Sequence, residues 1–130
     1  MKSYFADTNF YLRFILQDNK EQADKVEGDL KKASRGQKRI VFLSAVFLEM
    51  AFVLKSYYSL STSEIARYLS ILVKTKYLEI EDREIWLRVF SNYVTRSISL
   101  MDLFLFERAK DAGGDVLSFD KDFERLKQLS

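Results

Sequence analysis

The chain has 130 residues, of which 48% are hydrophobic, and its formal net charge is +2. This length and apolar content are typical of one folded domain and argue against intrinsic disorder. The chain contains no cysteine and no histidine, which excludes disulfides, thiolate or imidazole metal sites and every mechanism with a histidine base. Catalysis would therefore depend on carboxylates, hydroxyls, lysine, arginine or a bound hard cation.

The first half of the chain alternates between short apolar runs and amphipathic segments. Residues 3–6 (SYFA) are expected to form a buried strand, followed by a helix over residues 8–17. A second helix is expected over residues 20–33, with Ala23, Val26, Leu30 and Ala33 on one stripe. The run RIVFLS, residues 39–44, is typical of a buried strand because it is β-branched and aromatic. The helix after it carries an apolar stripe of Val46, Met50, Val53 and Leu54.

The second half repeats this alternation. Ser61 and Glu64 form a capping-box pattern that opens a helix through Val73. Strands are expected at residues 77–80 (YLEI) and 115–119 (DVLSF), separated by helices over residues 83–94 and 99–110. Gly113 and Gly114 end the second of these helices. A short terminal helix is expected over residues 120–129.

Strands that alternate with helices predict a three-layer α/β/α fold with a central, mainly parallel sheet of four to five strands, in a single domain over residues 1–130. Sheets of this kind place their sites at the carboxyl ends of the strands. Asp7 follows the first predicted strand and Asp120 follows the last. Both side chains are therefore expected at the same edge of the sheet.

Two further acids stand in unusual positions. Glu49 falls on the predicted buried stripe of its helix, three residues after Val46, and Asp102 lies in the first turn of the apolar segment SLMDLFLFERA. Each acid also has an ordinary explanation: Asp7 and Asp120 could cap the helices that follow them, and Asp102 completes a pattern with Ser99 that suits a helix amino terminus. Glu49 is the hardest to explain in this way, since a buried glutamate without a partner is costly.

Four carboxylates that converge at one edge would repel one another unless a cation neutralised them. Without histidine or cysteine, the cation that fits is Mg²⁺ or Mn²⁺, which prefers oxygen ligands. Such an ion activates water and stabilises charge on a leaving oxygen. The pattern therefore favours phosphodiester hydrolysis.

At this point the sequence resembles the PIN-domain ribonucleases, most closely the toxin subunits of VapBC-type toxin–antitoxin pairs. The matching segments are FADTNFYL, LSAVFLEMAFVL and SLMDLFLFERAKDAGGDVLSFDKDF, in the family's order and over nearly the whole chain. The chain departs from the family in its bulky residues 103–106 and in ending after one helix past Asp120, where relatives add an edge strand.

The resemblance implies that Asp7, Glu49, Asp102 and Asp120 are the catalytic and metal-binding acids. It gives Asn9 a role in orienting Asp7 or a water, and places Ser118 along the pocket wall. Asp122 would be a supporting ligand or the cap of the terminal helix, and the cap is the preferred interpretation.

The expected partners are RNA, a cognate antitoxin and a second copy of the chain. A basic stretch of five residues either steers phosphates or is a solvated helix end: Lys31, Lys32, Arg35, Lys38 and Arg39. The aromatic residues of the middle helices exceed what a small core needs and favour a dimer face and an antitoxin groove: Tyr57, Tyr58, Tyr68, Tyr77 and Trp86.

The function expected is a metal-dependent endoribonuclease, acting in the cytoplasm as the toxin of a toxin–antitoxin pair. No window predicts a membrane span, and Asp7 and Arg13 interrupt the early apolar run that a signal peptide would need. Alternatives are a PIN nuclease of RNA processing without an antitoxin, and a non-catalytic PIN binding module. A phosphotransfer domain is a third, but Asn9 occupies the position where the phosphatase pattern has its second acid.

Overall fold

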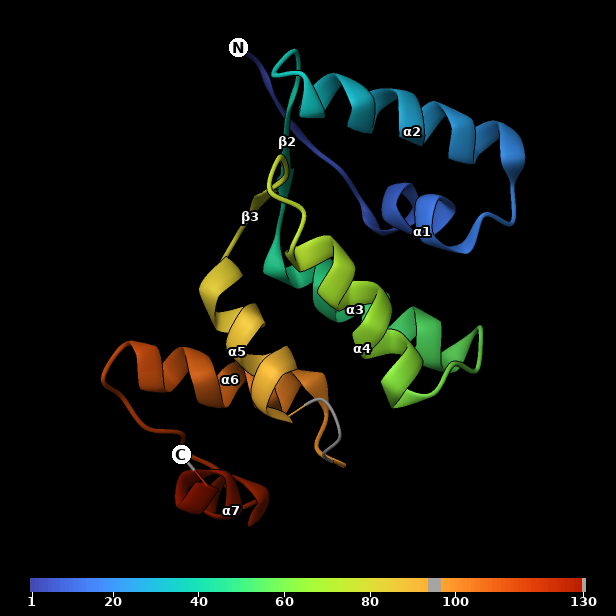
Figure 1. Ribbon diagram of the computed structural model, residues 1–130. Helices are drawn as coiled ribbons and strands as arrows, with labels where there is room; N and C mark the ends of the chain where they lie inside the picture. The colour runs from blue at the N-terminus through green and yellow to red at the C-terminus, as the bar shows by residue number, and fades with distance from the viewer. Residues whose placement is uncertain (94–96, 130) are drawn as a thin grey trace.

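The computed structural model describes residues 1–93 and 97–129 (Figure 1). Strands and helices alternate as predicted in the first half, and helices predominate in the second. In chain order the elements are β1 (Ser3–Phe5), α1 (Thr8–Leu16), α2 (Lys20–Ser34), β2 (Arg39–Phe42), α3 (Ser44–Ser56), α4 (Thr62–Val73), β3 (Glu79–Ile80), α5 (Arg83–Tyr93), α6 (Leu100–Asp111) and α7 (Asp122–Leu129).

The sheet is parallel, with the strand order β1-β2-β3 over the described residues. Ser3 pairs with Arg39 and Phe5 with Val41, and Phe42 pairs with Ile80. The strand predicted at residues 39–44 stops at Phe42, because Leu43 takes the position before the first residue of α3. In the part of the chain that the structure describes, β1 has a strand neighbour on one side only, which is β2.

The prediction of a fourth strand over residues 115–119 is wrong. These residues form no strand, so the sheet has three strands among the described residues, in place of the four to five expected. The turn that ends α6 is one reason: the Gly114 N–H bonds the Ala109 carbonyl at 2.8 Å, and Gly113 takes a positive φ of 71°. Strand propensity is context-dependent, and here no strand edge lies beside the segment.

The core is organised around an uninterrupted stack of aromatic side chains. Tyr11 of α1 stacks on Phe42 of β2 at 3.8 Å between ring centroids, and Phe42 stacks on Phe47 of α3 at 3.9 Å. Trp86 of α5 continues the series at 5.2 Å from Phe47. All four side chains are fully buried. Burial of this apolar area is the main force that joins the helices to the strands.

The predicted helices are confirmed, with ends that shift by a residue or two. The Ser61 hydroxyl accepts the Glu64 N–H at 3.2 Å and the Glu64 carboxylate accepts the Ser61 N–H at 2.9 Å, which is the capping box expected for α4. The stripe predicted for α2 is buried throughout. The predicted end of α5 at residue 94 lies outside the described residues.

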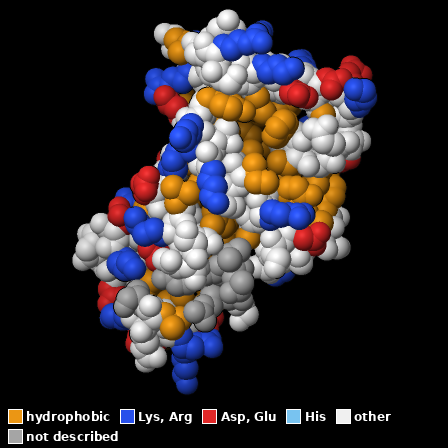
Figure 2. All heavy atoms as spheres, in the orientation of Figure 1, with side chains coloured by type: hydrophobic (Ala, Val, Ile, Leu, Met, Phe, Trp, Pro, Cys, Tyr) orange, Lys and Arg blue, Asp and Glu red, His pale blue; other side chains and the backbone are white. Residues whose placement is uncertain are grey.

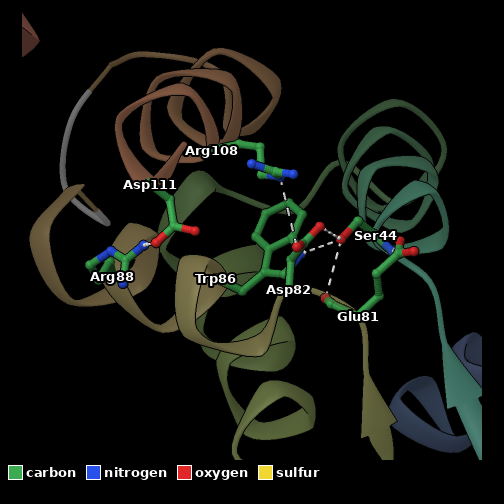
Figure 3. Close-up of polar contacts among 7 residues, drawn as sticks. All are labelled: Ser44, Glu81, Asp82, Trp86, Arg88, Arg108 and Asp111. Carbon is green, nitrogen blue, oxygen red and sulfur yellow. Dashed lines mark hydrogen bonds and ion pairs between the residues drawn. The ribbon is translucent and has the colours of Figure 1, made fainter. Parts of the chain in front are cut away.

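A polar network joins the carboxyl ends of β2 and β3 to α5 and α6 (Figure 3). The Ser44 N–H donates to the Glu81 carboxylate at 2.9 Å, and the Trp86 indole N–H donates to the Ser44 hydroxyl at 2.9 Å. Arg108 of α6 lies 3.9 Å from the Asp82 carboxylate. This network links the first residue of α3 to the residues after β3 and to α5, and it links Asp82 to α6.

In Figure 1 the strands occupy the upper part of the molecule, with α3 to α6 below them and α7 at the far end from the amino terminus. Within the described ranges, no helix combines the length and the apolar character needed to cross a membrane.

Candidate active site

Asp7 lies at the carboxyl end of β1, as predicted, and caps α1. Its carboxylate accepts the Phe10 N–H at 3.1 Å, so Asp7 does cap the helix that follows it, which was one of the two roles that the sequence allowed. The side chain remains exposed. A capping carboxylate has further lone pairs, and one hydrogen bond from the backbone leaves it able to bind a cation.

Glu49 lies beside the start of α1. The Thr8 hydroxyl donates a hydrogen bond to its carboxylate, which joins the middle of α3 to the residue that follows Asp7. The prediction that Glu49 is buried is wrong: the buried face of α3 consists of Phe47, Met50 and Leu54, and Glu49 is exposed. The observed buried face includes Phe47 in place of the Val46 and Val53 of the predicted stripe. The helix is therefore rotated relative to the prediction, and Glu49 lies on its solvent side.

Asp102 occupies the first turn of α6, where the Ser99 hydroxyl accepts its N–H at 3.2 Å. The side chain is half-buried. α6 contacts α3, and the residues just before Asp102, Ser99 to Met101, line a hollow of about 520 Å³ together with Leu48 and Phe52 of α3. The helices that carry Glu49 and Asp102 are therefore neighbours.

Asp120 is separated from these residues. It lies in the exposed segment between α6 and α7, where its N–H bonds the Ser118 hydroxyl and its carboxylate accepts the Asp122 N–H, both at 2.9 Å. The preferred interpretation of Asp122 as the cap of the terminal helix is wrong. Asp122 is the first residue of α7 and forms an ion pair with Arg125, and the carboxylate of Asp120 satisfies its N–H.

A second feature near Asp7 escaped the sequence interpretation. Between α1 and α2 lies an open hollow of about 310 Å³, lined by Asp7, Asn9 and Phe10 on one side and by Gln22, Lys25 and Asp29 on the other. Arg13 also lines it and forms an ion pair with Asp18 at 2.9 Å. Residues 22, 25 and 29 are spaced three and four apart and therefore share one helical face, a spacing from which this side of the hollow could have been predicted.

Lys25 is the most accessible positive charge in this hollow. It is exposed, and the described part of the chain supplies it with no ion-pair partner. Asn9 lines the same hollow as Asp7.

The basic stretch predicted from the sequence lies elsewhere. Arg39 pairs with Ser3 at the amino end of the sheet, opposite the end where Asp7 lies. Two of its charges are already paired, Lys38 with Asp29 at 2.7 Å and Arg39 with Glu79 at 2.7 Å. Lys31, Lys32 and Arg35 are exposed at the end of α2, as the solvated-helix interpretation expects.

The predicted aromatic surface is only partly exposed. Trp86 is buried in the core, which contradicts its assignment to a partner surface, and Tyr68 is half-buried. Tyr57, Tyr58 and Tyr77 are exposed, with Tyr57 at 77%. Trp86 is needed in the core because it stacks on Phe104 of α6 at 4.5 Å.

A parallel α/β sheet binds its ligands beyond the carboxyl ends of its strands, and Asp7 lies at that edge. The profile of the PIN domain matches residues 4–129, so the chain belongs to the PIN-domain family. PIN domains are usually nucleases, and nucleases of the family generally use divalent metals. Comparison with curated proteins and with solved structures gives no significant match.

The acids as arranged fit a metal only in part. Asp7, the residue before Thr8, and Glu49, which accepts a hydrogen bond from the Thr8 hydroxyl, offer hard oxygen donors, the type of ligand that Mg²⁺ requires. Within residues 1–93 and 97–129, however, no three acidic side chains lie close enough together to hold an ion. Glu81 and Asp82 also follow a strand at this edge, and although their carboxylates accept hydrogen bonds from Ser44, they keep further lone pairs as oxygen donors.

Proposed function

We propose that the chain is an endoribonuclease that requires Mg²⁺ or Mn²⁺, and that it acts as the toxin of a toxin–antitoxin pair. The observation that carries the nuclease part is the position of Asp7 and Glu49. Asp7 lies two residues past the end of β1, and Glu49 accepts a hydrogen bond from the hydroxyl of the next residue, Thr8. Membership of the PIN family across residues 4–129 supports the same activity.

The hollow between α1 and α2 supports RNA as the substrate. It begins at Asp7 and is bordered by Lys25 and Arg13, so a phosphate that reached Asp7 would lie near positive charge. An exposed lysine contributes to RNA binding by releasing counterions from the backbone, without reading sequence. The wall formed by Gln22 and Asn9 adds hydrogen-bonding groups for sugar or base atoms.

The apolar surface supports the antitoxin part of the proposal. The hollow between α3, α4 and the start of α6 is lined mainly by apolar side chains, among them Leu48, Ala51, Phe52, Ile65 and Met101. Phe52 is 63% exposed and Met101 50%. A groove of this character suits the apolar face of an amphipathic helix, the form in which a short regulatory protein would dock.

Asp7→Asn tests the nuclease directly. Asparagine caps a helix as well as aspartate does, so the variant should keep its stability while it loses a metal-binding charge. We expect wild-type protein to cut RNA oligonucleotides with Mg²⁺ or Mn²⁺ and to stop when EDTA is added, and we expect Asp7→Asn to be inactive with an unchanged melting temperature.

Asp24→Asn is the matched control, because it removes the same charge from an exposed position of α2 whose ion pair, within the described ranges, is with Lys20. It should cut RNA at the wild-type rate. Wild-type protein that cuts no RNA with either metal would refute the nuclease. An Asp7→Asn variant with the full biological effect would favour the non-catalytic binding module, and growth arrest that a neighbouring small protein relieves would support the toxin role.

A further inference from the structure

The turn that follows α3 presents two tyrosines at the surface. Tyr57 takes the position after the last residue of α3, where its N–H bonds the Val53 carbonyl at 2.9 Å. The Leu60 N–H bonds the Leu54 carbonyl at 3.1 Å and closes the turn. Tyr57 is 77% exposed and Tyr58 37%. The backbone of the turn is therefore fixed by hydrogen bonds, while its two aromatic rings remain open to solvent.

Arg13 joins this turn to the hollow that begins at Asp7. One terminal nitrogen of its guanidinium donates to the Tyr58 hydroxyl at 3.3 Å, and the other donates to the Asp18 carboxylate at 2.9 Å. The same side chain lines the hollow between α1 and α2 and is only 20% exposed. The guanidinium is held by two partners and in turn restrains the Tyr58 ring at its hydroxyl end. Groups that are already restrained lose less conformational freedom when they bind a ligand.

The path from Asp7 to Tyr58 follows one side of α1. Asn9 and Arg13 are four residues apart, so they share a helical face, and both line the hollow with Asp7. The six residues from Asp7 to Arg13 correspond to a helical rise of about 9 Å. Consecutive nucleotides of a stacked strand lie about 3.4 Å apart, so this length spans about two to three nucleotides.

The charges along this path favour RNA over a protein partner. Lys25 of α2 lines the other wall of the hollow, and Figure 2 shows Lys and Arg side chains along α2. Asp29 lines the hollow as well, but its charge is paired with Lys38 at 2.7 Å. A phosphate in the hollow therefore lies near positive charge, whereas a protein helix docks mainly by apolar anchors.

A tyrosine ring beside a guanidinium is a combination that binds unpaired bases. Every base has a flat π-face that stacks on an aromatic ring, and sequence-tolerant binding of single strands depends on such stacking. The bases of a duplex are stacked on one another and do not offer these faces. The turn after α3 therefore suits a single strand and not a double helix.

We propose that Tyr58, restrained by Arg13, is a base-stacking subsite that binds an unpaired RNA base about two to three nucleotides from the phosphate at Asp7. Tyr57, the preceding residue, offers a second exposed ring. The position of this base relative to the cut rests on the nuclease proposed above, whereas the binding of unpaired RNA at Tyr58 does not require cleavage.

Fluorescence anisotropy with a labelled, unpaired RNA oligonucleotide tests the subsite. All proteins in this assay carry Asp7→Asn, so that the RNA stays intact. Adding Tyr58→Ala should weaken binding by at least about fivefold, the lower end of the effect of stacking one base. Tyr58→Phe keeps the ring and should retain most of the affinity. The matched control is Tyr77→Ala, which removes a ring that is 41% exposed near β3 and should leave the affinity unchanged.

An abasic nucleotide locates the base that stacks. It replaces one nucleotide of the oligonucleotide at a time, and each version is measured with and without Tyr58→Ala. At one position the tyrosine substitution should have no further effect, because the base that the ring would contact is already absent. We expect this position about two to three nucleotides from the phosphate that the wild-type protein cuts.

The same oligonucleotide annealed to its complement should bind with an affinity that Tyr58→Ala does not change. Four results would overturn the subsite: no loss with Tyr58→Ala, an equal loss with Tyr77→Ala, an equal loss with Tyr58→Phe, or an equal loss for duplex RNA. If the wild-type protein cuts RNA in any of these cases, the nuclease stands without the subsite. Binding that depends on the Tyr58 ring, in a protein that cuts no RNA, would keep the subsite and refute the nuclease.

Discussion

Arg88 forms two ion pairs whose surroundings differ, and the difference predicts their contributions to stability. Its Nε lies 3.1 Å from the Glu107 carboxylate, which is fully buried, and a terminal nitrogen lies 2.9 Å from Asp111, whose side chain is 51% exposed (Figure 3 shows the Asp111 pair). Glu107 has one further cation nearby, Lys110 at 3.7 Å. The pair with Glu107 joins α5 to α6, the helix that carries Asp102.

The test substitution is Arg88→Met, which keeps an unbranched side chain that can pack along the same path and removes the guanidinium charge. Breaking a buried ion pair costs about 3–5 kcal/mol, because the remaining charge is left without its partner. Arg88 is itself 38% exposed and Lys110 remains, so the lower end of this range, about 3 kcal/mol, is expected. Asp111→Asn removes the exposed pair from the same arginine and should cost less than about 1 kcal/mol.

Urea unfolding followed by circular dichroism measures both variants, with the free energy of unfolding extrapolated to water. The double variant Arg88→Met with Glu107→Met should recover most of the loss, since an apolar pair of similar volume needs no partner. Equal losses for Arg88→Met and Asp111→Asn, or no recovery in the double variant, would refute the assignment of the stability to the buried pair.

Two further predictions concern RNA binding and the core. Lys25→Ala should weaken the binding of a labelled RNA oligonucleotide to the Asp7→Asn protein and make the slope of log affinity against log salt shallower by about 0.7. Lys31→Ala, the control, should leave this slope unchanged. Fluorescence anisotropy at several salt concentrations measures both slopes, and a change with Lys31→Ala but not with Lys25→Ala would place the RNA at the basic stretch. Tyr11→Phe should stabilise the protein by about 1 kcal/mol, because the buried Tyr11 hydroxyl has no hydrogen-bond partner among the described residues. Burial also raises the pKa of Tyr11 far above its ordinary value. Thermal unfolding measures the change, and a loss of stability would show that the hydroxyl has a hydrogen-bond partner.

The order and type of most elements could be predicted from local sequence. The stripe of Ala23, Val26, Leu30 and Ala33 and the capping box of Ser61 and Glu64 are properties of a single helix, and the structure contains both. The same is true of Asp7, whose place follows from the end of one short strand. Such features depend on neighbours a few residues apart, which the sequence shows directly.

Features that depend on distant segments could not be predicted. Glu49 was expected inside, and the packing of Phe47 on Phe42 and Trp86 turned the helix so that Glu49 faces solvent. Lys25 escaped notice because its place beside Asp7 results from the packing of α2 on α1.

The sequence by itself determined that Asp7 lies past the first strand, that Glu49 and Asp102 lie on helices, and that any metal must be bound by oxygen. Only the tertiary structure decided which of these acids meet, because the meeting depends on strand pairing. Val116, Leu117 and Phe119 give residues 115–119 the apolar pattern of a strand, yet a strand exists only where a second edge supplies its hydrogen bonds. That edge, at β1, lies at the other end of the molecule.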